Sequence, residues 1–221
     1  MISQPPPLSL PKTLGMICIL AAICQGCLSR PHLNRQAFIF SAPVIPATSG
    51  VSSGRTLGVR SLQVAAPFEG RSLVYRTGEF SYARDPYAEF LVSPATDLAS
   101  LIRNSLREAG GFSDVAEVGA ALKANTLVEI SVSQLYGDFR QSGHPAAVLT
   151  MRFVFLDAPN GVPEKVIFER EYSRAILLRS ATAVVLMEGW NHALAQVLTE
   201  VISDFRHSAV ESPRLSSERG M

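Results

Sequence analysis

The segment Glu79–Val115 constrains the fold most, because it contains a helix with both a start signal and a stop signal. Ser93 suits the N-cap position, where a hydroxyl accepts a hydrogen bond from an orphan backbone amide. Pro94 suits the first helical position, where its missing N–H costs nothing. Gly110 and Gly111 supply a left-handed stop at the other end. The pattern predicts one helix over residues 94–109.

The apolar residues of this helix recur at spacings of three and four, so they share one face. That face consists of Leu98, Leu101, Ile102, Ser105, Leu106 and Ala109. The opposite face consists of Arg103, Asn104, Arg107 and Glu108. A helix with this pattern packs one face against a sheet.

The remainder of the chain is predicted to form strands and one more helix. Before the first helix, strands are expected at residues 37–40, 57–64 and 73–75. After it, they are expected at residues 128–133, 147–156 and 165–172, the last two joined by a hairpin turn at Pro159-Asn160-Gly161. A long helix is expected from Ala181 to Phe205. Its buried face would be Leu186, Trp190, Leu194, Val197, Leu198, Val201 and Phe205. The order predicts an α+β domain with a single, mostly antiparallel or mixed sheet and two helices on one face.

The N-terminus has the features of an export signal. Lys12 precedes an apolar run at residues 14–24, which is too short for the roughly 20 apolar residues of a membrane span. Cys27 follows Gly26 and resembles the lipidated cysteine of a bacterial lipobox, with Cys24 as the alternative. The expected organisation is a signal peptide at 1–26, a lipidated tether at 27–36, a domain at 37–206 and a disordered tail at 207–221.

Composition argues against several functions. The net charge of +1 gives no electrostatic case for nucleic acid. The three cysteines all lie within the first 27 residues, so nothing after Cys27 can supply a thiolate to a metal or a nucleophile. His192 sits off the apolar stripe of its helix, and Asp85 with Glu89 is typical of a turn rather than an acid–base pair. We expect no catalytic residue, metal or cofactor.

Aromatic residues concentrate before the first helix, which indicates either core packing or a contact surface for a partner. Alternation places Phe80 and Tyr82 on one face. A second aromatic segment begins the loop after the strand at 128–133. The candidate partner surface is Tyr82, Tyr87, Phe90, Tyr136 and Phe139.

Three stretches together resemble the ABC-type transport auxiliary lipoprotein family, which includes the lipoprotein of the paraquat-inducible Pqi system. The first is the cysteine-ending signal followed by AFIFSAP at residues 37–43. The second is residues 57–115, and the third is residues 124–158. The resemblance covers residues 37–205 and lies in the order and spacing of the stretches. It implies a fold related to the N-terminal domain of TolB.

The resemblance also implies a role and partners. The chain would be a non-catalytic accessory subunit of a transporter that moves lipids between the inner and outer membranes and supports outer-membrane integrity. Its partners would be a periplasmic mammalian-cell-entry (MCE) protein, an ABC permease and an ATPase, and a homo-oligomer is compatible with the sequence. Leu28 after the cysteine favours the periplasmic face of the outer membrane of a Gram-negative bacterium. The alternatives are an envelope lipoprotein that binds a cell-wall synthase or a secretion pore, and a secreted hydrolase.

Overall fold

The computed structural model describes residues 35–41, 43, 54–109, 112–116, 124–141, 143–159, 162–163 and 165–211, with side chains described as far as residue 208. Gly110 and Gly111, both candidate anchor cysteines, the signal peptide and the tail after residue 211 lie outside the described residues. All described residues belong to the unit that begins at Arg35.

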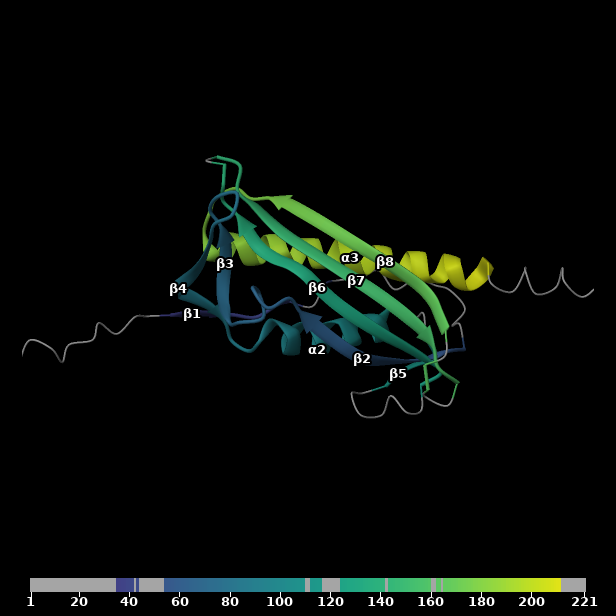
Figure 1. Cartoon of the computed structure of the whole chain (residues 1–221). Helices are drawn as coiled ribbons and strands as arrows, with labels where there is room; N and C mark the ends of the chain where they lie inside the picture. Colours follow the sequence, from purple (N-terminus) through teal and green to yellow (C-terminus); the bar gives the residue numbers. More distant parts are fainter. Residues whose placement is uncertain are drawn as a thin grey trace, which may run out of the picture. The chain divides into compact units, whose positions relative to one another are not determined.

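The described strands form one mixed eight-stranded sheet (Figure 1). The strands are β1 (Gln36–Phe38), β2 (Thr56–Val64), β3 (Ser72–Arg76), β4 (Tyr82–Phe90), β5 (Asp114–Ala116), β6 (Thr126–Asp138), β7 (Ala146–Asp157) and β8 (Lys165–Leu177). The antiparallel strands β6, β7 and β8 are its largest part. The other side of β6 pairs in parallel with β2 along its first half and with β3 at its end. Strand β4 joins β3, and β1 joins β4.

Helix α2 (Pro94–Glu108) begins as the sequence predicts. The Ser93 hydroxyl accepts a hydrogen bond from the Thr96 amide at 3.3 Å, and Pro94 occupies the first turn. Every residue of its predicted apolar face is buried: Leu98, Leu101, Ile102, Ser105, Leu106 and Ala109. Because this face covers β2, α2 supports the sheet at that strand.

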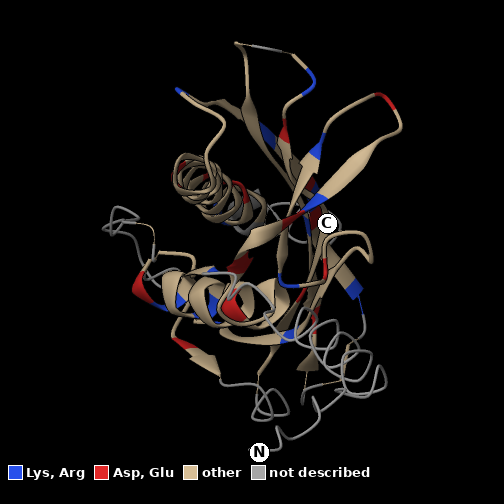
Figure 2. Cartoon of the chain, turned by 90° about the vertical axis from the view of Figure 1, so that its left-hand side faces the viewer, with Lys and Arg blue, Asp and Glu red and all other residues tan. Residues whose placement is uncertain are grey.

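Helix α3 (Ala183–Glu211) covers β7 and β8 on the same face of the sheet. Its predicted buried residues are all buried, and the Trp190 indole N–H donates to the Val148 carbonyl at 3.1 Å. The Arg206 guanidinium donates to the Ala109 carbonyl at 2.8 Å, which ties α3 to the end of α2. Figure 2 shows both helices on one side of the sheet. The α+β fold with two helices on one face is therefore confirmed.

Two residues just after β1, Phe40 and Ser41, are fixed to both helices. Phe40 stacks on Phe90 with ring centroids 5.5 Å apart and contacts Trp190 at 6.5 Å. The Phe40 amide donates to the buried Asp97 carboxylate of α2 at 2.8 Å. The Ser41 amide donates to Asn191 of α3 at 3.0 Å. The residues that follow the predicted tether are thus part of the core.

Several element boundaries differ from the prediction. Strand β6 continues to Asp138, inside the predicted loop, because Tyr75 and Arg76 of β3 pair with its last residues. Strand β8 continues to Leu177, because β7 offers it a full antiparallel partner. Helix α3 continues to Glu211, into the segment predicted as a tail. Strand β5 was not predicted, since three residues carry no periodic pattern.

Candidate functional site

The most exposed aromatic side chain among the described residues lies at the tip of the β3–β4 hairpin. Phe80 is 88% exposed there, and Tyr82 at the start of β4 is 49% exposed. Phe68, from the turn after β2, and Tyr136, from β6, are buried and contact the Tyr82 ring. We call Phe68, Phe80, Tyr82, Tyr136 and Arg76 the hairpin surface.

Ring contacts connect three distant segments in the hairpin surface. Tyr82 meets Tyr136 edge-on with centroids 5.7 Å apart, and it meets Phe68 at 6.2 Å. Phe68 stacks on Tyr136 at 5.7 Å. Edge-to-face and offset-stacked rings are favourable arrangements. The cluster therefore gives the hairpin a rigid base, while Phe80 projects from its tip.

Arginine side chains border this surface. The Arg76 guanidinium lies 5.8 Å from the centre of the Tyr82 ring and donates to the Glu79 carbonyl at 2.8 Å. Arg140, after β6, is paired with Asp138 at 2.6 Å. Hydrogen bonds from Arg140 lower the pKa of the Asp138 carboxyl. An exposed aromatic beside arginine is the composition that protein interfaces favour.

The structure separates the five residues that the sequence proposed as a partner surface. Tyr82 and Tyr136 come together, but Tyr136 is buried under Tyr82. Phe139 is partly buried and stacks on Tyr75 at 4.8 Å. Tyr87 is 55% exposed near the other end of β4. The prediction is wrong for Phe90, which is 2% exposed because it packs between Phe40 and Trp190.

Sequence reasoning missed Phe68 and Arg76 as parts of this surface. Phe68 follows a turn and shares no periodic pattern with β4 or β6, so only the tertiary fold brings it to Tyr82. The sequence placed Phe80 and Tyr82 on one face by strand alternation, but β4 begins only at Tyr82 and Phe80 lies in the turn before it.

The carboxylates spaced four apart in β4 have structural partners. Asp85 accepts hydrogen bonds from the amides of Tyr87 at 2.7 Å and Ala88 at 3.0 Å, and from the Tyr75 hydroxyl. Burial and the Asp85 carboxylate raise the pKa of Tyr75. Glu89 pairs with Arg71 at 2.9 Å. Both carboxylates hold the irregular part of β4, where the register with β3 shifts.

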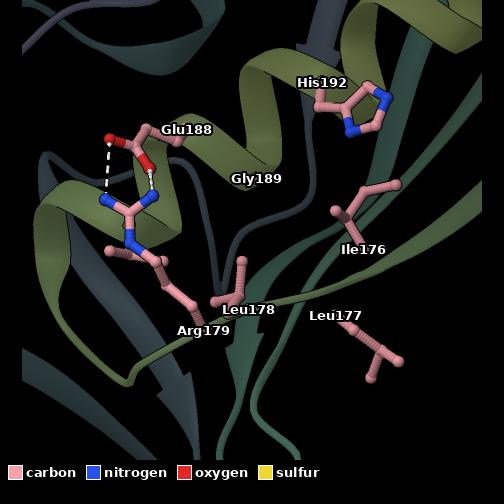
Figure 3. A pocket seen from close by; sticks show the side chains of 8 residues that line it. Ile176, Leu177, Leu178, Arg179, Glu188, Gly189 and His192 are labelled. Atoms are coloured by element: carbon pink, nitrogen blue, oxygen red, sulfur yellow. Dashed lines mark hydrogen bonds and ion pairs between the residues drawn. The ribbon is translucent and has the colours of Figure 1, made fainter.

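An open groove of about 250 Å³ lies between the end of β8 and the first half of α3 (Figure 3). Arg179 and Glu188 form an ion pair across one end at 3.1 Å. Leu178 lies beneath Gly189, and His192 stands a turn further along the helix. His192 is exposed and lies 3.1 Å from Gln196. The polar groups do not converge on a common point, so the groove has no arrangement typical of a reaction.

Two further observations concern the described residues. None of their His, Cys, Asp and Glu side chains form a group of three or more that could hold a metal ion. Within the same residues, no helix has the length and apolar character needed to cross a membrane. Lys and Arg are interspersed with Asp and Glu over the side shown in Figure 2.

Solved structures share this fold. Protein XCC0632 from Xanthomonas campestris, of family DUF330, superposes with a TM-score of 0.63 at 16% identity, covering 81% of this chain and 97% of that one. An uncharacterized protein superposes with a TM-score of 0.56 at 13% identity, covering 77% of this chain and 99% of that one. At these identities the likeness shows the fold alone.

A more distant similarity is to the lipoprotein GNA1162 from Neisseria meningitidis. Its TM-score is 0.27 at 12% identity, with 65% of this chain and 97% of that one covered, which is too low to support an argument. None of these three proteins is named as an enzyme. No family model matches the chain. No curated protein matches it either.

Proposed function

We propose that this chain is a lipid-anchored envelope protein that serves as the accessory subunit of an ABC/MCE-type lipid transport system. It resides on the periplasmic face of the outer membrane of a Gram-negative bacterium and binds the MCE protein. The permease and the ATPase of the system carry out transport, and this chain performs no reaction. Its role is to attach the transport system to the outer membrane.

The observation that carries the protein-binding part is Phe80. A large aromatic side chain with 88% of its surface exposed is costly in water, and Phe80 lies two residues before Tyr82, whose ring contacts the rings of Phe68 and Tyr136. Protein interfaces concentrate their binding energy in a few such large side chains. The hairpin surface is thus the binding site for the partner protein.

The identity of the partner is supported by the sequence. The resemblance to the auxiliary lipoprotein family covers residues 37–205. This range contains β2 to β8 completely and all of β1 except Gln36. The α+β fold that the resemblance implied is the fold observed. The cysteine at position 27 precedes the first described residue, Arg35, by eight positions, as a short anchor tether requires.

The test is affinity purification of the tagged, full-length chain from gently solubilised membranes, followed by mass spectrometry. We expect an MCE protein, an ABC permease and an ATPase to co-purify. The variant Phe80→Ala should co-purify with much less of these partners, because the substitution removes the exposed aromatic side chain without touching the core. Val162→Ala, at a site 60% exposed and outside the hairpin surface, is the matched control and should retain it.

Recovery of a cell-wall synthase or a secretion channel, without an MCE protein, would reject the transport role in favour of another envelope partner. Equal recovery with Phe80→Ala and Val162→Ala would place the binding site away from the hairpin surface.

A further inference from the structure

Exposed apolar side chains also gather at the edge of the sheet formed by β1 and β4. Ile39 is 54% exposed, Leu91 is 55% exposed and Val92 is 38% exposed. Tyr87 adds an aromatic ring at 55% exposure. We call these four residues the edge patch.

The strand pairing places two members of the edge patch side by side. Phe38 is the partner of Phe90, and the Leu91 amide donates to the Phe38 carbonyl at 2.7 Å. The next residues along, Ile39 and Leu91, are therefore neighbours. Among the described strands β1 pairs only with β4, so this pair lies at a sheet edge.

Ile39 and Leu91 each lie next to a buried aromatic residue of the core. Phe40 and Phe90, on either side of them in sequence, are buried at 4% and 2% exposure and stack against each other. Ile39 and Leu91 directly follow the last residues of β1 and β4, and both remain exposed beside these buried rings. Contiguous apolar surface of this kind marks a contact site.

The position of the proposed anchor in the sequence limits how far this contact site can lie from the membrane. Cys27 precedes Arg35 by eight positions, which span about 29 Å at full extension. The residue after Arg35 begins β1, the strand that leads into the edge patch. A lipid on Cys27 therefore keeps this edge of the domain close to the bilayer.

The charges beside the patch suit a phospholipid surface. Arg35 and Arg71 both pair with Glu89, at 3.6 Å and 2.9 Å, and their side chains are 56% and 48% exposed. Two positively charged guanidinium groups thus share one negatively charged carboxylate beside the edge patch, which leaves a local excess of positive charge. Cationic and tyrosine side chains at the rim of an apolar surface are typical of membrane interfaces.

We propose that the edge patch lies on the phospholipid leaflet that holds the Cys27 anchor, with Arg35 and Arg71 against lipid phosphates. This inference rests on the lipid anchor of the proposed function. Tyr82 of the hairpin surface begins β4, whereas Leu91 and Val92 of the edge patch follow its last residue, so contact at these two residues would leave Tyr82 at the end of β4 away from the membrane.

The test uses the full-length, acylated chain in vesicles of phosphatidylethanolamine and phosphatidylglycerol. An environment-sensitive fluorophore is attached to a cysteine introduced by Leu91→Cys. The matched control is Val166→Cys on β8, at the opposite edge of the sheet and with a similar exposure of 47%. The chain without an added cysteine is the labelling blank. Both sites are exposed, so neither substitution disturbs the core.

Quenching by lipids with brominated acyl chains is the readout. We expect the Leu91 label to be quenched several-fold more than the Val166 label and its emission to shift to the blue. Mass spectrometry of the same samples reports the acyl group. An acylated chain with equal quenching at the two sites would overturn the edge-patch inference alone. A chain without the acyl group would overturn the anchor and this inference together.

Discussion

Gly189 shows how one residue sets the distance between a helix and the sheet. A Cβ atom at this position would lie 2.5 Å from Leu178 Cδ2 and 2.7 Å from Ala147 Cβ. From sequence alone, a glycine in mid-helix only weakens the helix, by about 1 kcal/mol relative to alanine. In the structure its missing side chain lets α3 approach the strands closely enough for Trp190 to reach the Val148 carbonyl.

The substitution Gly189→Ala should destabilise the domain even though alanine is the better helix former. We expect a loss of about 1–3 kcal/mol in the free energy of unfolding, because the added methyl group overpacks against Ala147 and Leu178. Denaturant unfolding followed by circular dichroism measures it. Ser203→Ala, at an exposed site on the same helix, should change stability by less than about 0.5 kcal/mol. A stabilised Gly189→Ala variant would show that α3 does not approach so closely.

The position of Asp97 in its helix could be predicted from the sequence, but its hydrogen-bond partner could not. Its place in the first turn of α2 follows from the helix dipole. Its main partner, the Phe40 amide, lies 57 residues away and carries no sequence signal that points to Asp97. The same limit applies to Phe68 in the hairpin surface.

At the scale of elements, periodicity predicted the faces of both helices and the alternation of β6. Val128, Ile130 and Val132 are buried, as the alternation requires. The parallel pairing of β2 and β3 with β6 was not predicted, because such pairs are joined by long connections and no local pattern selects them. The three-residue shift of register in β4 around Asp85 was also missed, since a bulge breaks the alternation that prediction relies on.

The apolar face of α2 makes a sharp prediction for that element. Leu101→Asp should cost about 3 kcal/mol or more, because Leu101 is 7% exposed and the substitution buries an unpaired charge. The thermal midpoint measures the loss. Asn104→Asp introduces the same residue on the exposed face and should change stability by less than about 0.5 kcal/mol. An unchanged midpoint for Leu101→Asp would mean that the buried face is wrongly assigned.

At the scale of the whole molecule, the proposed lipid anchor would set the membrane at which the domain works. We expect Cys27→Ser to abolish incorporation of a labelled fatty acid in cells, because we propose the Cys27 thiol as the acceptor of the acyl chain. Cys24→Ser should leave the incorporation intact. Persistent labelling of Cys27→Ser, with loss in Cys24→Ser, would move the anchor to Cys24 and lengthen the tether by three residues.

The fixation of the first strand also has a consequence for the order of folding. Ser41 bonds to Asn191 across 150 residues of sequence, and Phe40 packs on Trp190. These contacts cannot form until α3 has been synthesised, so Phe40 and Ser41 pack in place only after nearly the whole domain is present. Contacts between such distant residues slow folding. An enzyme that acylated Cys27 before folding was complete, as the proposed anchor would allow, would act on a chain in which Phe40 and Ser41 are not yet packed against α3.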